Sequence, residues 1–151
     1  MASGAEIPTA ATERSASPAA VAAVGTVAEP RWSPDGRRLA WVRATPHGRV
    51  LVVDGHPVPD LVPAGTRGGT FTWLDADRVL VVAEAGLHTV RVDGAGPGTL
   101  TVAARGRAAA PAVCAADGLV AFVDDTGEEC RVVVAPLDGS REPWPVSTAD
   151  F

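Results

Sequence analysis

Residues 30–42 read PRWSPDGRRLAWV, in which a polar Ser-Pro-Asp-Gly turn separates two short runs of tryptophan and aliphatic residues. Proline and the Asp-Gly pair suit the backbone angles of a tight reversal, and the flanking apolar residues favour strands. The segment therefore predicts a β-hairpin. The same pattern recurs twice further along the chain.

The second and third copies read FTWLDADRVLVVA over residues 71–83 and PAVCAADGLVAFV over residues 111–123. Their first strands align at intervals of 41 and 40 residues on Trp32, Trp73 and Val113. The same intervals align two apolar sets in the second strands: Leu39, Leu80 and Val120, and Trp41, Val82 and Phe122. Repeats of this length without helical periodicity are typical of β-propeller blades. We expect these residues to be buried between neighbouring blades: Trp32, Leu39, Trp41, Trp73, Leu80, Val120 and Phe122.

A second pair of strands is predicted after each copy. These pairs cover residues 49–53 and 58–62, residues 87–92 and 99–102, and residues 130–135 and 142–146, each pair joined through an Asp-Gly turn. Four strands in each repeat make one blade. The predicted fold class is therefore all-β: a partial β-propeller of three four-stranded antiparallel blades with a short N-terminal helix.

The expected domain organisation follows from these repeats. Residues 1–16 form a flexible arm, and residues 17–28 a short helix and lead-in, with Ser17 as cap, Pro18 at the first helical position and Gly25 at the stop. Blades 1, 2 and 3 occupy residues 29–66, 67–106 and 107–148, and residues 149–151 start a missing fourth blade. Propellers remove open strand edges by closing a ring, so we expect part of a longer protein or one partner of an assembly.

The composition limits the classes of partner. The 151 residues carry 13 basic against 18 acidic side chains, a formal net charge of −5, and every basic residue is arginine. This balance argues against nucleic acid and anionic membranes, and the absence of lysine excludes Schiff-base chemistry. No apolar run approaches the roughly 20 residues of a membrane span, and the first residues lack the basic start of a secretory signal. We therefore expect a cytoplasmic protein.

The potential metal ligands are scattered along the sequence. We interpret Cys114 and Cys130 as buried free thiols, and His47, His56 and His88 as isolated surface residues beside turns. A zinc site needs a tighter set of ligands than these. We therefore predict no metal and no cofactor.

The acidic pairs and the tryptophans have structural interpretations too. Asp35-Gly36 is expected to be a hairpin turn and Arg37-Arg38 a solvated pair. The remaining acidic sites lack the ligand spacing of a calcium loop and are interpreted as solvated turn charges: Asp75 and Asp77, and Asp124-Asp125 with Glu128-Glu129. The tryptophans are expected to pack between blades rather than stack on a ligand.

Residues 29–42 (EPRWSPDGRRLAWV) resemble the blade signature W-S-P-D-G-x-x-[LIV]-A-[FYW]. This signature is shared by the N-terminal propellers of the prolyl oligopeptidase family and by the Tol-system periplasmic propeller protein. Three features favour the peptidase: the predicted helix that leads into blade 1, the blade-ending strand VVVAPLDGS over residues 132–140, and residues 149–151, which resemble the start of the next blade. The chain resembles bacterial acylaminoacyl-peptidases and dipeptidyl-aminopeptidases of this family of serine proteases.

The resemblance implies a hydrolase-associated but non-catalytic role. In that family the propeller covers an α/β-hydrolase domain, which carries the catalytic residues, and admits only short peptides. Ser33 and Ser140 lie in turns without a G-x-S-x-G elbow, so we assign no catalytic residue here. Some members hold a peptide amino terminus with paired glutamates. Glu128-Glu129 lies on a hairpin tip, not in a helical insertion, and is not assigned that role.

The expected function is therefore to gate peptide access to a C-terminal hydrolase domain. The expected partners are downstream blades, that hydrolase domain and a short peptide, and open blade edges predict self-association. The alternative is a stand-alone propeller scaffold or binding protein of the Tol-system type.

Overall fold

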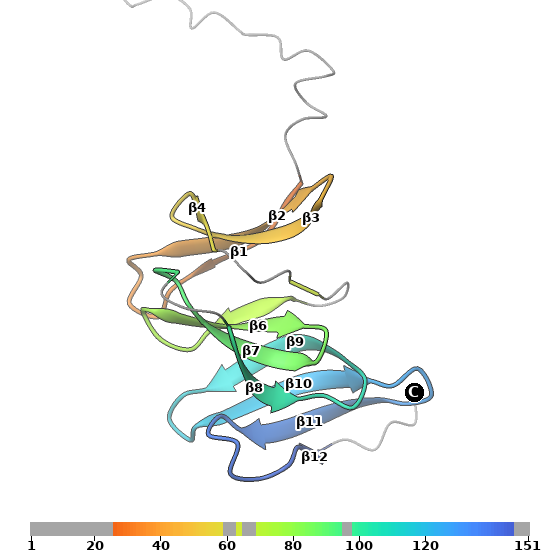
Figure 1. Cartoon of the computed structure of the whole chain (residues 1–151). Coiled ribbons are helices and arrows are strands. Elements are labelled where there is room, and N and C mark those ends of the chain that lie inside the picture. Colours follow the sequence, from red (N-terminus) through yellow and green to blue (C-terminus); the bar gives the residue numbers. More distant parts are fainter. Residues whose placement is uncertain (1–25, 59–62, 65–68, 95–97, 147–151) are drawn as a thin grey trace, which may run out of the picture.

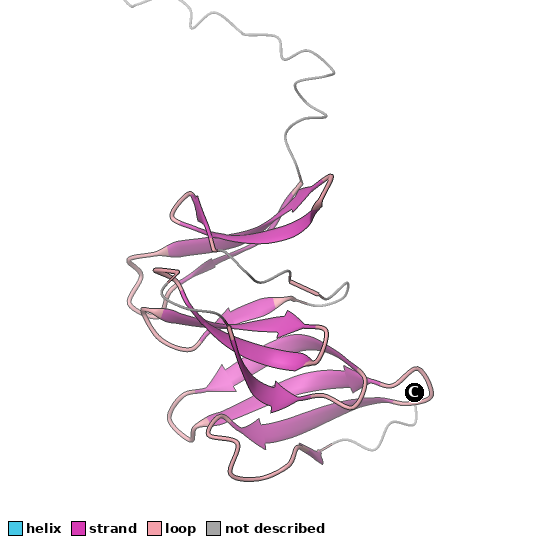
Figure 2. Cartoon of the chain, viewed as in Figure 1, coloured by secondary structure: helices cyan, strands magenta, loops and turns pink. Residues whose placement is uncertain are grey.

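The computed structural model describes residues 26–58, 63–64, 69–94 and 98–146. These residues contain twelve β-strands and no helix (Figures 1 and 2). The predicted arm over residues 1–16, the predicted helix over residues 17–25 and the predicted start of a fourth blade over residues 149–151 lie outside the described residues.

The strands form three four-stranded antiparallel sheets in which consecutive strands are neighbours. Blade 1 contains β1 (Val27–Trp32), β2 (Leu39–Thr45), β3 (Gly48–Val53) and β4 (His56–Pro57). Blade 2 contains β5 (Phe71–Trp73), β6 (Arg78–Ala83), β7 (Gly86–Arg91) and β8 (Thr99–Ala103). Blade 3 contains β9 (Arg107–Cys114), β10 (Leu119–Asp125), β11 (Cys130–Pro136) and β12 (Trp144–Pro145). The predicted three-bladed all-β architecture is confirmed, and Figure 1 shows blade 2 stacked between the other two.

The outer strand of blade 1 begins earlier than the sequence predicted. Asp54 and Gly55 have φ angles of 49° and 87°, so they form a two-residue reversal with both positions left-handed. The return strand therefore starts at once, as β4, and Val58 already follows it. The rest of the strand predicted over residues 58–62 lies outside the described residues.

The strand register corrects the alignment of the three repeats. Trp32 pairs with Leu39, Trp73 with Val79, and Val113 with Val120. The turn of blade 2 is therefore one residue shorter than the other two. Because side chains alternate between the faces of a strand, a turn that is one residue shorter changes which residues of the second strand face the preceding blade. The structural equivalents of Leu39 and Trp41 are Val79 and Val81 in blade 2, followed by Val120 and Phe122 in blade 3, not Leu80 and Val82.

Two hydrophobic clusters fill the two junctions between blades. The first joins Ala40, Val42, Leu51, Val53 and Val58 of blade 1 to Phe71, Trp73, Val79, Val81 and Val90 of blade 2. The second joins Leu80, Val82, Leu87 and Val102 of blade 2 to Ala108, Val120, Phe122, Val133 and Ala135 of blade 3. Each blade thus has a leading face, directed at the blade before it in sequence, and a trailing face, directed at the blade after it.

The leading face of blade 1 departs from the predicted burial. Trp73, Leu80, Val120 and Phe122 are buried as expected. Trp32 is 63% exposed, and Leu39 and Trp41 are only half-buried. The reason is their position: no blade precedes blade 1 in the described part of the chain, so their face is not covered as the leading faces of blades 2 and 3 are.

The Trp73→Ala substitution tests the first junction. Trp73 is 7% exposed, and its indole Nε1 donates a hydrogen bond to the Arg31 carbonyl at 3.1 Å. Truncation to alanine should lower the free energy of unfolding by about 3–5 kcal/mol, measured by urea denaturation. Trp73→Phe keeps most of the ring and should cost clearly less. A loss below about 1 kcal/mol for the alanine variant would contradict this packing.

Candidate functional site

The innermost strands carry a repeated irregularity at matched positions. Glu29 and Ala110 have φ angles of 56° and 51°, a left-handed conformation that is uncommon outside glycine. Each lies where the pairing with the second strand shifts by one residue, which defines a β-bulge. Thr70 occupies the equivalent position at the start of blade 2. The bulge therefore recurs in blades 1 and 3, whereas the pairing of β5 with β6 in blade 2 is regular.

These positions connect neighbouring blades through hydrogen bonds. The Glu29 Oε2 atom accepts hydrogen bonds from the Thr70 backbone N–H at 2.7 Å and from its hydroxyl at 3.2 Å. The Ala110 N–H donates to the Gly69 carbonyl at 3.0 Å. A Cβ on Gly69 would lie 3.1 Å from Arg31 Nη2, so the blades approach one another closely here. The Glu29 carboxylate is therefore a structural group that fixes the start of blade 2.

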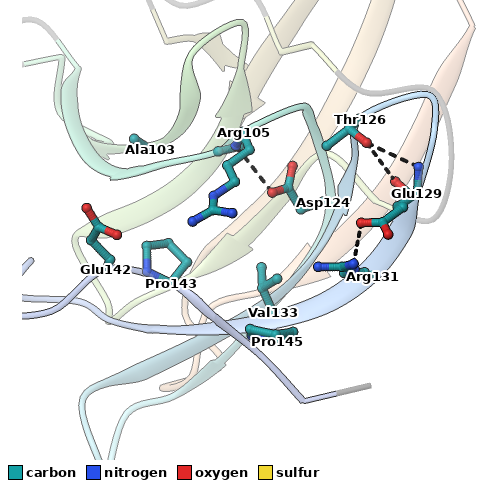
Figure 3. A pocket seen from close by; sticks show the side chains of 11 residues that line it. Ala103, Arg105, Asp124, Thr126, Glu129, Arg131, Val133, Glu142, Pro143 and Pro145 are labelled. Carbon is teal, nitrogen blue, oxygen red and sulfur yellow. Dashed lines mark hydrogen bonds and ion pairs between the residues drawn. The ribbon is translucent and has the colours of Figure 1, made fainter. Parts of the chain in front are cut away.

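A crevice of about 320 Å³ opens between the outer strands of blades 2 and 3 (Figure 3). Its walls combine small apolar groups and proline rings with charged side chains. It is lined by Ala103, Ala104, Arg105, Asp124, Thr126, Glu129, Arg131, Val133, Glu142, Pro143 and Pro145.

Asp124 connects the two blades beside this crevice. It is 7% exposed, and its carboxylate accepts backbone hydrogen bonds from Arg105 at 3.2 Å and from Gly106 at 2.8 Å. The sequence interpretation of Asp124 as a solvated turn charge is therefore wrong. Asp124 continues the alternation of Val120 and Phe122 along β10, which directs it at blade 2. A Cβ on Gly106 would lie 2.2 Å from the Asp125 carbonyl, so only glycine fits at that contact.

Charged side chains occupy the walls of the crevice. Arg131 forms an ion pair with Glu129, whose backbone N–H donates to Thr126 Oγ1 at 3.1 Å. The Arg105 guanidinium points into the crevice, and Glu142 and Pro143 lie on the other side (Figure 3). The described lining residues include no serine, cysteine or histidine. This arrangement is suited to holding a polar or charged group against an apolar wall.

The two candidate serines are held in turns. The Ser33 hydroxyl donates to Asp35 Oδ1 at 2.6 Å and accepts from the Arg38 N–H at 3.0 Å. Ser140 donates its backbone N–H to Asp138 Oδ1 at 2.9 Å. Within the described residues, neither hydroxyl has a histidine as hydrogen-bond partner. Their geometry is that of hairpin turns, not of a nucleophile elbow.

Three further acidic residues, Asp75, Asp77 and Asp125, form ion pairs with arginines. Asp75 forms an ion pair with Arg78 at 2.6 Å, and its Oδ1 accepts the Asp77 N–H at 2.9 Å. Partial burial opposes ionisation of Asp75, but the hydrogen bond from Arg78 still lowers its pKa. Asp125 faces Arg107 at 3.5 Å. Across the part of the chain that the structure covers, no three His, Cys, Asp or Glu side chains gather as a metal site would require.

The cysteines differ from the sequence interpretation in one respect. Both are free, but both are exposed rather than buried. Cys114 pairs with Leu119 and Cys130 with Asp125, which places both at the margins of the trailing face of blade 3. No following blade covers that face among the described residues. Cys114 Sγ lies 3.1 Å from Asp117 Oδ2, to which it donates.

His47 and His56 are exposed and His88 is half-buried, on three different strands or turns. Within the described ranges, no helix has the length and apolar character that crossing a bilayer requires.

Comparison with known proteins identifies the fold. No family model matches the chain, and no curated protein matches it. Among solved structures, a TolB-like protein from Agrobacterium tumefaciens superposes with a TM-score of 0.59 at 14% sequence identity. The match covers 85% of this chain and 50% of that one, so the chain spans half the length of that protein. At this identity the likeness shows the β-propeller fold alone.

Sequence reasoning missed the polar groups that join the blades. Glu29 could have been noticed, because it stands 41 residues before Thr70 and 81 before Ala110 at a matched repeat position. Asp124 could have been noticed from the alternation of Val120 and Phe122. Nothing in the sequence indicated that Arg105 and Glu142 line one crevice, because they come from different blades.

The Asp124→Ala substitution should weaken the second junction. It leaves the Arg105 and Gly106 N–H groups without their acceptor, which should cost about 1–3 kcal/mol of unfolding free energy. Amide exchange at those two residues should accelerate. The matched control is Asp125→Ala, which removes an exposed ion pair with Arg107 and an exposed hydrogen bond from the Gly127 N–H, and which should cost about 1 kcal/mol or less. Equal losses for the two variants would show that Asp124 does not hold the junction.

The Ser33→Ala substitution should raise the pKa of Asp35. The Ser33 hydroxyl is the main reason that this pKa lies below its ordinary value of 3.8, and the Arg37 N–H adds to it. Because the folded-state pKa is lowered, the carboxylate stabilises the turn above the ordinary pKa, and that contribution is lost as the pH falls through the lowered value. Carboxyl carbon NMR shifts would follow the change. The pKa of Asp138, lowered chiefly by Ser140, should stay constant as the internal control.

Proposed function

We propose that this chain is a non-catalytic propeller scaffold that binds a partner without converting it. The crevice between blades 2 and 3 supports this proposal best. It sets the Arg105 guanidinium and the Glu142 carboxylate against proline and valine walls (Figure 3). Such a mixture of fixed charge and apolar surface recognises ligands, and its described lining includes no serine, cysteine or histidine.

A second candidate function is the gating of a serine peptidase. The turn from Ser33 to Gly36 supports it, because it matches the blade signature of the prolyl oligopeptidase family, and its Ser33–Asp35 hydrogen bond gives that motif a structural reason. In this function the blades would restrict access of short peptides to an α/β-hydrolase domain. The nucleophile, base and oxyanion hole would then reside in that domain.

The 151-residue chain should not react with a fluorophosphonate probe. It should also leave aminoacyl and acyl-peptide esters and amides intact, because Ser33 and Ser140 lie in turns and, among the described residues, neither hydroxyl has a histidine as its hydrogen-bond partner. Intact-protein mass spectrometry measures the labelling. Stoichiometric modification of Ser33 or Ser140 would overturn the non-catalytic assignment.

The same probe separates the two candidates when it is applied to the protein isolated from its source cells with an antibody. A probe-labelled serine on the polypeptide that carries this sequence, or on a stoichiometric partner, would support peptidase gating. A complex that contains no labelled hydrolase would support the scaffold alone.

A further inference from the structure

The leading face of blade 1 is an apolar surface that the described chain leaves exposed. Trp32 in blade 1 is the structural equivalent of Trp73 in blade 2. Each is the last residue of its blade's first strand and pairs with the first apolar residue of the second strand, Leu39 for Trp32 and Val79 for Trp73. Trp73 is 7% exposed and Trp32 is 63% exposed. The exposed fractions of these two equivalent side chains differ because blade 1 packs over Trp73, whereas no described blade packs over Trp32. The partner that Trp32 lacks is therefore the trailing face of another blade.

One such trailing face lies uncovered, within the described residues, on blade 3. Ala121, Val123, Val132 and Val134 of blade 3 take the positions that Ala40, Val42, Leu51 and Val53 take in blade 1, as the shared strand pairing shows. In blade 1 these residues are packed under blade 2. In blade 3 the equivalent of Leu51, which is 1% exposed, is Val132, which is 37% exposed.

We propose that a second copy of this chain closes the ring. The leading face of blade 1 in each copy packs on the trailing face of blade 3 in the other, so the dimer contains two identical head-to-tail junctions. The inference rests on the proposed scaffold function, in which the three blades are a sector of a propeller. Two copies carry six blades, and closed propellers have about four to eight.

The junction between blades 1 and 2 contains a hydrogen bond that we expect to recur at the proposed junction between the two copies. Between blades 1 and 2, the Trp73 indole donates to the Arg31 carbonyl at 3.1 Å. Ala112 holds the Arg31 position in blade 3, since it pairs with Ala121 as Arg31 pairs with Ala40. We therefore expect the Trp32 indole of one copy to donate to the Ala112 carbonyl of the second copy.

Sedimentation equilibrium of the 151-residue chain over a wide concentration range tests the proposal. The expected species is a dimer of two 15.4 kDa chains that does not grow further. Trp32→Asp and Val132→Asp should each raise the dissociation constant by about 30-fold or more, as loss of a central interface residue does. Leu100→Asp is the matched control. Leu100 is a 47% exposed side chain on β8 of the middle blade, and its variant should dimerise normally.

Mixing the two variants gives the sharpest outcome. A Trp32→Asp chain retains an intact trailing face and a Val132→Asp chain retains an intact leading face, so the mixture should recover one wild-type junction and form a mixed dimer. Far-UV circular dichroism checks that each variant is folded, and Trp32→Ala replaces Trp32→Asp if it is not.

Three results would overturn the proposal. A chain that stays monomeric at millimolar concentration would leave both faces for blades of another kind. Loss of association for Trp32→Asp but not for Val132→Asp would show a contact between two leading faces. Continued growth into larger species would show that the junction does not close. None of these results bears on the scaffold function, whose failure would appear as probe labelling of the chain.

Discussion

Both faces of a propeller blade are apolar, and each must be covered by another blade. The constraint is visible in β6, where four consecutive residues from Val79 to Val82 are each at most 1% exposed. Side chains alternate along a strand, so Val79 and Val81 pack on blade 1 while Leu80 and Val82 pack on blade 3. A continuous apolar run is therefore required in the middle blade. The terminal blades satisfy the requirement on one side only, which explains the exposure of Trp32 and Val132.

Polar contacts fix how the covered faces sit on one another. Apolar packing alone is not directional, so blades could slide without further restraints. At the inner strands, Glu29 and Ala110 connect successive blades through bulges. Beside the crevice, Asp124 accepts two N–H groups from the segment that leads into blade 3. These contacts restrain each junction at defined points, and the crevice lies beside the second restraint.

The sequence predicted the elements well and their surroundings less well. The hairpins and the three blades follow from local turn chemistry and alternating apolar residues, which are properties of short segments. The exposure of Trp32 and of the cysteines depends on which face has a neighbour, and that is a property of the assembly. The register of blade 2 was misassigned because a repeat interval does not reveal where a residue is missing. The crevice was not predicted, since its charged residues come from separate blades and each looks ordinary in isolation.

The shortened turn of blade 2 indicates where this architecture tolerates change. In blade 1 the turn closes with a hydrogen bond from the Ser33 N–H to the Arg38 carbonyl, and in blade 2 with one from the Leu74 N–H to the Arg78 carbonyl, both at 2.9 Å. The turn of blade 2 has one residue fewer between the two hydrogen-bonded residues, yet the strands of blade 2 still pack on blades 1 and 3. Length variation is thus absorbed at the hairpin tip and does not reach the junctions. The turns between the first and second strands can therefore change in length and composition while the packing between blades is kept. Surface residues in these turns can evolve without altering the residues on which folding depends.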